Sequence, residues 1–221
     1  MYLVYFIIGI NMIASLYGFK NEFFLEKFMF KTDKILQNKE YYRLVTSAFI
    51  HNDLSHLGFN LFSFYSFGRI LEIELGFFPF LIIYLVSLIA SELFSLYVHR
   101  INPNYRALGA SGAISGVIFS FIVFFPDTKM SVFFIPGIPA WLFGIVYTLI
   151  SIYGLQSGAG RIGHSAHLGG GIAGVLVTLA MYPFLIFESS YVIAGILIPF
   201  VIFTIILLIQ PNFFNKIKSL E

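Results

Sequence analysis

The chain has 221 residues, of which 58% are hydrophobic and only 11% are charged. Soluble globular domains carry about 25% charged residues, so this composition excludes an ordinary water-soluble domain and indicates a membrane protein. The formal net charge of +2 is too small to indicate a nucleic-acid partner. The absence of cysteine excludes disulfides, thiolate metal sites and thiol nucleophiles.

Seven apolar segments are predicted to be membrane-spanning helices, because a helix needs about 20 apolar residues to cross a bilayer. In chain order they are residues 2–19, 55–73, 77–98, 108–125, 140–155, 165–187 and 190–210. The first has no Lys or Arg and no small-residue cleavage site, so we expect a retained span and not a signal peptide. The fold class predicted is an all-α polytopic membrane protein.

Residues 20–54 form the longest hydrophilic stretch, and they hold six of the 13 Lys and Arg residues. This stretch is far longer than a connection between two helices needs, and long connections are usually functional. We therefore expect a structured first loop.

Three polar residues stand at the starts of the second, fourth and sixth apolar segments, namely His56, Ser111 and His167, separated by 55 and 56 residues. If all seven segments span the membrane, the second, fourth and sixth segments run through it in the same direction. The three side chains then reach one face of the membrane at similar depth. Ionisable groups inside membrane spans are costly and usually functional.

Ser111 lies in the glycine-rich run Leu108–Gly116, for which two interpretations exist. Glycines in a membrane helix usually serve close helix packing. Alternatively, a serine in the first turn of a helix lies beside unpaired N–H groups and a positive dipole end. Acyl transfer needs such donors for its oxyanion.

His167 is followed by Gly170 and Gly174 at four-residue spacing, so its helix can pack very closely. It is either a hydrogen-bonded core histidine or a base that activates the Ser111 hydroxyl. The acidic residues after Ser111 are Asp127, Glu188 and Glu221, and none is well placed to orient His167. Asp53 and Glu92 stay open as a third member, and the economical interpretation is a Ser–His dyad.

His51, His56 and Asn60 form a third group, in which His56 and Asn60 share one helical face. They are either interfacial polar residues or side-chain donors for an oxyanion. Together with His164 and His167, the histidines also permit a metal site. A His-Glu-x-x-His helix is missing from the sequence, so no metal is expected.

These motifs resemble those of the rhomboid intramembrane serine proteases, and the resemblance runs through nearly all of a six-helix core. Gly109-Ala110-Ser111-Gly112 looks like the nucleophile motif, and Ala166-His167-Leu168-Gly169-Gly170 looks like the general-base motif. The spacing of His51, His56 and Asn60 is similar to the second-helix motif, and Arg43 fits the first-loop signature. Tyr42 stands where many members carry Trp, and Ser115 stands where some carry an aromatic that stacks on the base.

The resemblance implies a fold and roles for the residues. The fold would be a six-helix rhomboid-like bundle with one further C-terminal helix (6+1), with the core at residues 1–187 and the extra helix and tail at residues 188–221. Ser111 would be the nucleophile and His167 the general base and acid. His56, Asn60 and the Ser111 backbone N–H would hold the oxyanion. Arg43, His51 and Glu72 would support the first loop, and Phe59 would border the substrate gate beside the fifth span.

The resemblance further implies single-span transmembrane proteins as substrates and lipids as surroundings, with no cofactor and no particular oligomeric state. The family places the site on the extracytoplasmic face of the plasma membrane. The positive-inside rule opposes this, because the inner loops would hold only Arg69 and Lys129 of the 13 basic residues. The alternative functions are a non-catalytic relative that binds transmembrane helices and a small transporter or metal site built from the histidines.

Overall fold

The computed structural model describes residues 2–132, 135–157 and 163–209. Each of the seven apolar segments contains one long helix. These helices are α1 (Tyr2–Gly18), α5 (Leu54–Leu75), α6 (Phe77–His99), α7 (Ser111–Phe124), α8 (Ala140–Ser157), α9 (His164–Met181) and α11 (Ser190–Ile209). The predicted tail, residues 210–221, lies outside the described residues.

Four of these helices, α6, α8, α9 and α11, are long and apolar enough to cross a membrane. Helices α1 and α7 are apolar but shorter, with 17 and 14 residues. Helix α5 has 22 residues, but polar side chains such as His56, Asn60 and Arg69 interrupt its apolar sequence. The chain is therefore a mostly helical, multi-pass membrane protein.

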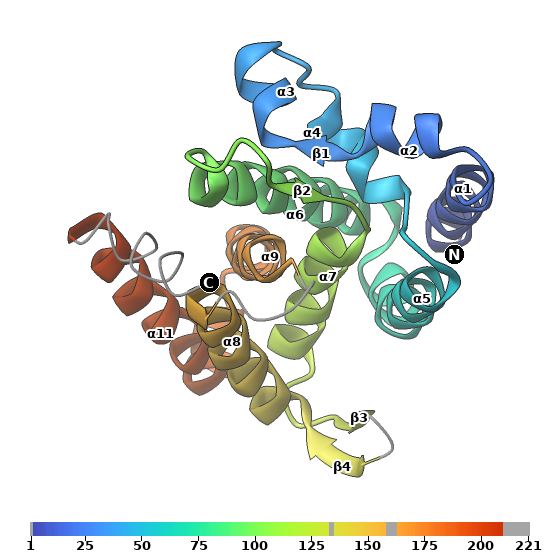
Figure 1. Cartoon of the computed structure of the whole chain (residues 1–221). Helices are drawn as coiled ribbons and strands as arrows, with labels where there is room; N and C mark the ends of the chain where they lie inside the picture. Colours follow the sequence, from blue (N-terminus) through green and yellow to red (C-terminus); the bar gives the residue numbers. More distant parts are fainter. Residues whose placement is uncertain (1, 133–134, 158–162, 210–221) are drawn as a thin grey trace.

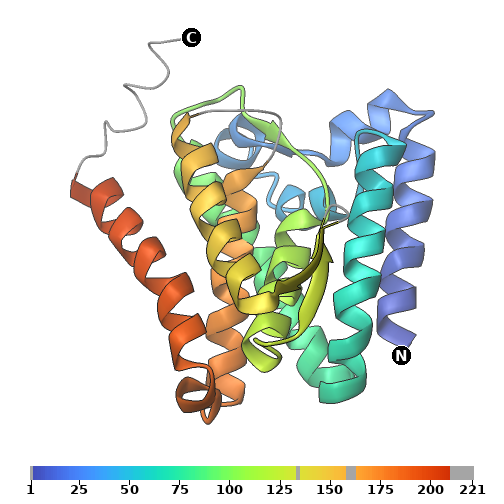
Figure 2. The same ribbon diagram turned by 90° about the horizontal axis from the view of Figure 1, so that it is seen from below.

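Helix α7 forms the centre of the bundle, because every residue from Gly112 to Val123 is buried. Helices α6 and α9 lie against it, with α1 and α5 on one side and α8 and α11 on the other (Figure 1). Figure 2, seen from below, shows the long helices side by side. A helix buried on all faces need not present 20 apolar residues to lipid, so its length of 14 residues is tolerated.

Glycine allows α7 and α9 to touch through their backbones. A Cβ atom placed on Gly170 would lie 2.7 Å from the carbonyl carbon of Gly112, and one on Gly174 would lie 2.6 Å from the Cα of Gly116. One turn further on, the Ser120 hydroxyl lies 2.8 Å from the Gly116 carbonyl oxygen and 3.2 Å from that of Gly174. Small residues thus permit both close packing and a hydrogen bond between helices.

The first loop is structured, as expected for residues 20–54. It contains α2 (Glu22–Phe28), β1 (Phe30–Lys31), α3 (Thr32–Gln37), α4 (Arg43–Thr46) and the 3-10 turn η1 (Ser47–Phe49). Strand β1 pairs antiparallel with β2 (Arg106–Ala107), which lies just before α7. The loop is therefore joined to the segment that leads into Ser111.

The structure departs from the predicted helices in two places. An all-helical chain was expected, but β3 (Lys129–Val132) and β4 (Ile135–Pro139) form an antiparallel pair between α7 and α8, and β1–β2 is a second short pair. The predicted segment 165–187 is also too long, because α9 ends at Met181 and is followed by Pro183, which cannot continue a helix. The short α10 (Leu185–Glu188) then leads to α11.

Candidate active site

Ser111 is the first residue of α7, and its side chain is half-buried. The N-cap residue is Ala110, which has no side-chain acceptor for the N–H groups of the first turn. These unpaired donors and the positive end of the helix dipole favour negative charge beside Ser111.

The backbone before Ser111 is held by the first loop and by two histidines. The Gly109 N–H donates to the Ser47 carbonyl at 2.9 Å, and the Ala110 N–H lies 3.4 Å from His51 Nε2. Gly109 has φ +119°, and a Cβ there would lie 2.7 Å from two atoms of the His56 imidazole. Only glycine suits this backbone, and its absent side chain lets His56 pack two residues from Ser111.

His51 is fully buried, and its Nδ1 lies 2.9 Å from Ser15 Oγ on α1. Burial, with a smaller effect of neighbouring His56, lowers the pKa of His51 to about 3. The imidazole is therefore neutral at physiological pH. Because Nε2 accepts from Ala110, Nδ1 carries the proton and donates to Ser15. His51 thus links α1, the first loop and the start of α7.

His56 and Asn60, both on α5, differ in the hydrogen bonds that they make. The backbone N–H of His56 donates to Asp53 Oδ1 at 2.8 Å, while its ring packs edge-on against that of His51, with centroids 4.9 Å apart. Asn60 is buried, and its amide donates to the His56 carbonyl at 2.9 Å. One N–H of Asn60 is thus used within α5, and among the described residues none accepts a hydrogen bond from the other. Phe59, on the same helix, is 57% exposed.

His167 lies in the first turn of α9, and its imidazole stacks on Tyr147 of α8, with ring centroids 5.8 Å apart and planes 24° apart. The Tyr147 hydroxyl lies 2.8 Å from Ser115 Oγ, which in turn donates to the Ser111 carbonyl at 2.8 Å. Within the described ranges, no hydrogen bond joins Ser111 Oγ to His167. The residues are connected instead through Ser115 and Tyr147.

The remaining candidate partners of His167 lie elsewhere or contact it weakly. The His164 ring meets it edge-on at 6.4 Å. Asp53 caps α5 and Glu92 is buried on α6, and neither has a described contact with His167. Among the residues that the structure describes, no group of three or more His, Asp or Glu side chains gathers where it could hold a metal ion.

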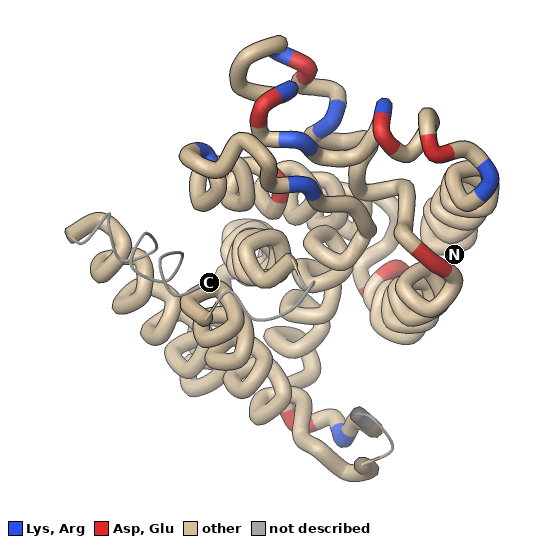
Figure 3. The backbone as a smooth tube through the Cα atoms, viewed as in Figure 1, with Lys and Arg blue, Asp and Glu red and all other residues tan. Residues whose placement is uncertain are grey.

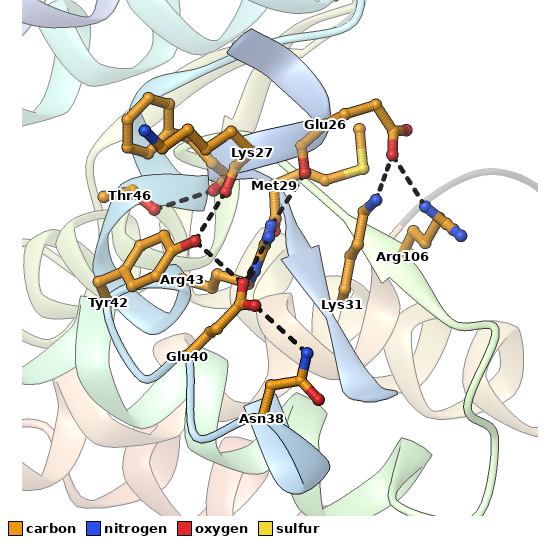
Figure 4. A network of polar contacts seen from close by, with 11 residues as sticks. Glu26, Lys27, Met29, Lys31, Asn38, Glu40, Tyr42, Arg43, Thr46 and Arg106 are labelled. Carbon is orange, nitrogen blue, oxygen red and sulfur yellow. Dashed lines mark hydrogen bonds and ion pairs between the residues drawn. The ribbon is translucent and has the colours of Figure 1, made fainter. Parts of the chain in front are cut away.

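Arg43 organises the first loop from a buried position (Figure 4). Its guanidinium donates to the carbonyls of Glu26 and Met29 at 3.0 and 2.7 Å and pairs with Glu40 at 2.7 Å. The hydrogen bond from Arg43 lowers the pKa of the Glu40 carboxyl. Most of the basic residues drawn in Figure 3 gather around this loop.

A second set of charges ties the loop to β2. Glu26 pairs with Lys31 and, at 3.2 Å, with Arg106. The hydrogen bond from Lys31 is the main cause that lowers the pKa of Glu26. Arg106 lies five residues before Ser111, so the loop charges act on the segment that carries the site.

Glu72 lies at the opposite end of α5 from the loop. Its carboxylate accepts from the backbone N–H groups of Leu3 and Val4 at 2.9 and 3.0 Å. These contacts cap the start of α1 and do not touch the first loop. Twelve residues of helix separate Glu72 from Asn60 by about 18 Å, and the support of the first loop by Glu72 stays a prediction.

Tyr147 is the site residue that the sequence did not reveal. It lies on the fifth apolar segment, 20 residues before His167, and no periodicity connects the two. The only signal in the sequence is indirect, namely the small residue Ser115 at the position where some family members carry an aromatic residue. An aromatic ring does stack on His167, but it comes from another helix.

The comparisons with known proteins agree with this architecture. The Rhomboid domain matches residues 38–184. Rhomboid protein 1, mitochondrial, of Saccharomyces cerevisiae is 35% identical over 183 residues, covering 79% of this chain and 51% of that protein. Rhomboid protease GluP of Bacillus subtilis is 29% identical over 180 residues, covering 81% and 32% of the two chains. Rhomboid protease AarA of Providencia stuartii is 29% identical over 166 residues, covering 64% and 56%.

The chain belongs to the rhomboid family, because the matched domain covers well over half of it. Its relatives include proteins named as rhomboid proteases, from bacteria, and proteins named as mitochondrial. The matches span about a third to just over half of the length of these relatives.

Proposed function

We propose that this protein is an intramembrane serine endopeptidase that cleaves single-span transmembrane proteins through a dyad of Ser111 and His167. The observation that carries the proposal is the position of Ser111 at a helix start whose first-turn N–H groups have no side-chain cap. The glycine contacts between α7 and α9 hold the helix of His167 against it. Catalytic hydrogen bonds are often long before substrate binds, so the dyad contact is expected to form in the substrate complex.

In the proposed reaction, Ser111 Oγ attacks the scissile carbonyl while His167 accepts its proton. The tetrahedral oxyanion takes hydrogen bonds from the Ser111 backbone N–H and from the side chains of His56 and Asn60. His167 then gives the proton to the leaving amine, and the acyl-enzyme forms. Water, deprotonated by His167, attacks the ester carbonyl and releases Ser111.

The dimensions of α7 support a cut just below the membrane surface. Its 14 residues span about 21 Å, against about 30 Å of hydrocarbon. Ser111 would then lie several ångströms below one surface. The polar side chains around it would provide the water-containing cavity that hydrolysis in a membrane needs.

The proposed organisation is a core of residues 1–187 and an additional helix with its tail in residues 188–221. Phe59, exposed on α5, would border the substrate gate between α5 and α8. In a cell membrane the face that carries His56 and the first loop would be extracytoplasmic. The positive-inside rule opposes this orientation, whereas the structured first loop, in which Arg43 pairs with Glu40 and Lys31 pairs with Glu26, is not a free tether.

Orientation is open to a direct test because the native chain has no cysteine. Single cysteines at exposed Asn104, on the Ser111 side, and at exposed Glu188, on the other side, can be labelled with a membrane-impermeant maleimide in intact cells. The proposal predicts labelling at position 104 only, and labelling at position 188 only would reverse the orientation.

The enzyme proposal is tested with purified protein reconstituted in liposomes with a panel of single-span substrates. Wild type is expected to cleave at least one substrate, and Ser111→Ala is expected to cleave none. Binding of substrate helices without cleavage by wild type would instead support the alternative, a non-catalytic protein that binds transmembrane helices.

A further inference from the structure

The face of the His167 imidazole is covered by a side chain from a helix that carries neither dyad residue. Tyr147 of α8 lies over it with ring centroids 5.8 Å apart and planes 24° apart. That separation is within the range of favourable offset stacking. An imidazole covered in this way cannot rotate freely about its χ2 torsion.

Tyr147 is itself fixed from several directions. Its hydroxyl lies 2.8 Å from Ser115 Oγ, and because the Ser115 hydroxyl donates to the Ser111 carbonyl, Tyr147 donates to Ser115. Phe119 packs edge-on against its ring at 5.5 Å, and Phe143 lies at 5.6 Å. Both hydroxyl and ring are therefore positioned.

Ser115 provides both the space and the anchor for this arrangement. It lies one turn after Ser111 on α7 and is 1% exposed. A larger side chain at this buried position would occupy the volume that Tyr147 fills. A serine leaves room for the ring and supplies an acceptor for its hydroxyl, which an alanine would not.

We propose that Tyr147 is a positioning residue for His167 and that Ser115 fixes Tyr147 in place through its hydroxyl, a role that rests on the proposed function. Tyr147 restricts the rotation of the imidazole so that one ring nitrogen faces Ser111. The stack connects α8 to the base, and the hydrogen bond connects α8 to the helix of the nucleophile. The orientation of the base thus depends on the packing of three helices.

The first test measures labelling of Ser111 by a fluorophosphonate probe in Tyr147→Leu, Tyr147→Phe and Ser115→Ala. Loss of the stack in Tyr147→Leu is expected to lower the labelling rate about tenfold. Tyr147→Phe keeps the stack and should retain most of the rate. Ser115→Ala should resemble Tyr147→Phe, and the double variant should be no slower than either, because both changes remove one hydrogen bond.

The matched control is Tyr153→Leu, the same substitution on the same helix at a side chain that is 69% exposed. In this variant, the probe should label Ser111 at the wild-type rate. With a cleavable substrate, Tyr147→Leu should lower kcat and leave KM unchanged, because the change affects the base and not the binding of substrate. Equal rates in Tyr147→Leu and Tyr153→Leu would overturn the inference.

The second test reads the stack without catalysis, by NMR of protein labelled with ¹³C at histidine Cε1. The chain has five histidines, and His167→Asn assigns the signal. A ring-current shift of the His167 signal is expected in wild type and Tyr147→Phe and should disappear in Tyr147→Leu. An unchanged signal in Tyr147→Leu would refute the stack. If the fluorophosphonate probe did not label Ser111 in wild type, the proposed protease function would be refuted. The NMR result would still decide whether Tyr147 stacks on His167.

Discussion

Replacing Gly170 by alanine should separate α7 from α9 and damage both stability and the site. The new Cβ would lie 2.7 Å from the Gly112 carbonyl carbon, whereas ordinary contact begins at 3.4 Å. The Gly112 carbonyl oxygen would lie closer still, so the helices would have to separate by more than about 0.7 Å, because the obstructing atoms are backbone and cannot rotate away. No rearrangement of a single side chain relieves this overlap.

The expected loss follows from two opposing effects. Overpacking a tight interface costs about 1–3 kcal/mol, while Gly→Ala within a helix gains about 0.5–1 kcal/mol. Since the clash is with backbone, we expect a net loss of about 2 kcal/mol. For a chain of this size that loss lowers the melting temperature by about 4–8 °C. Gly170 lies one turn after His167, so the rate of Ser111 labelling should also fall about tenfold or more.

Thermal unfolding in detergent, followed by circular dichroism, measures the stability effect, and fluorophosphonate labelling measures the site. The control is Gly9→Ala on α1, where a Cβ would have nothing within 4 Å. This control should melt at the wild-type temperature or slightly above. If Gly170→Ala matches wild type in both measurements, the backbone contact between α7 and α9 does not govern the site.

Three further predictions concern the surroundings of the site. The pKa of His51 is lowered to about 3 in the folded protein, against about 6.5 in the unfolded chain. The contribution of the neutral imidazole to folding stability is therefore complete above about pH 6.5 and is lost as the pH falls toward 3, by up to about 5 kcal/mol. His51→Gln should flatten this part of the pH profile of stability, measured with denaturant, and a profile identical to that of wild type would contradict the prediction. Arg43→Met leaves the carbonyls of Glu26 and Met29 and the carboxylate of Glu40 without their buried donor, so the loss of the carbonyl hydrogen bonds should cost about 1–3 kcal/mol of stability and expose the first loop to trypsin. Glu72→Ala removes the cap of α1 and should lower stability by about 1–2 kcal/mol, whereas Glu72→Gln, which keeps the acceptor oxygen, should lose less.

The sequence predicted the helices well because apolar composition determines where a chain can cross a membrane. All seven segments contain helices, and the one large boundary error comes at Pro183, whose effect on the helix end was overlooked. Strands β1 and β2 are not predicted from the sequence because they have two residues each and depend on partners distant in sequence. Such pairs leave no periodic pattern.

The candidate site was predictable only where helix direction decides position. The alternation of helix direction brings the starts of α5, α7 and α9 together, as the contacts of Gly109 with His56 and of Gly112 with Ala166 show. Tyr147 could not be predicted, because the rotation of α8 about its axis depends on packing against α7 and α9. The support of the first loop by Glu72 rests on a spacing alone and stays a prediction, beside the contacts of Glu72 with the start of α1.

The most direct measurement of the central claim is labelling of the folded, reconstituted protein by a fluorophosphonate probe, with the modified residue identified by mass spectrometry. Wild type should be labelled at Ser111, and neither Ser111→Ala nor His167→Ala should react. Absence of labelling in wild type, or equal labelling of His167→Ala, would contradict a serine nucleophile activated by His167.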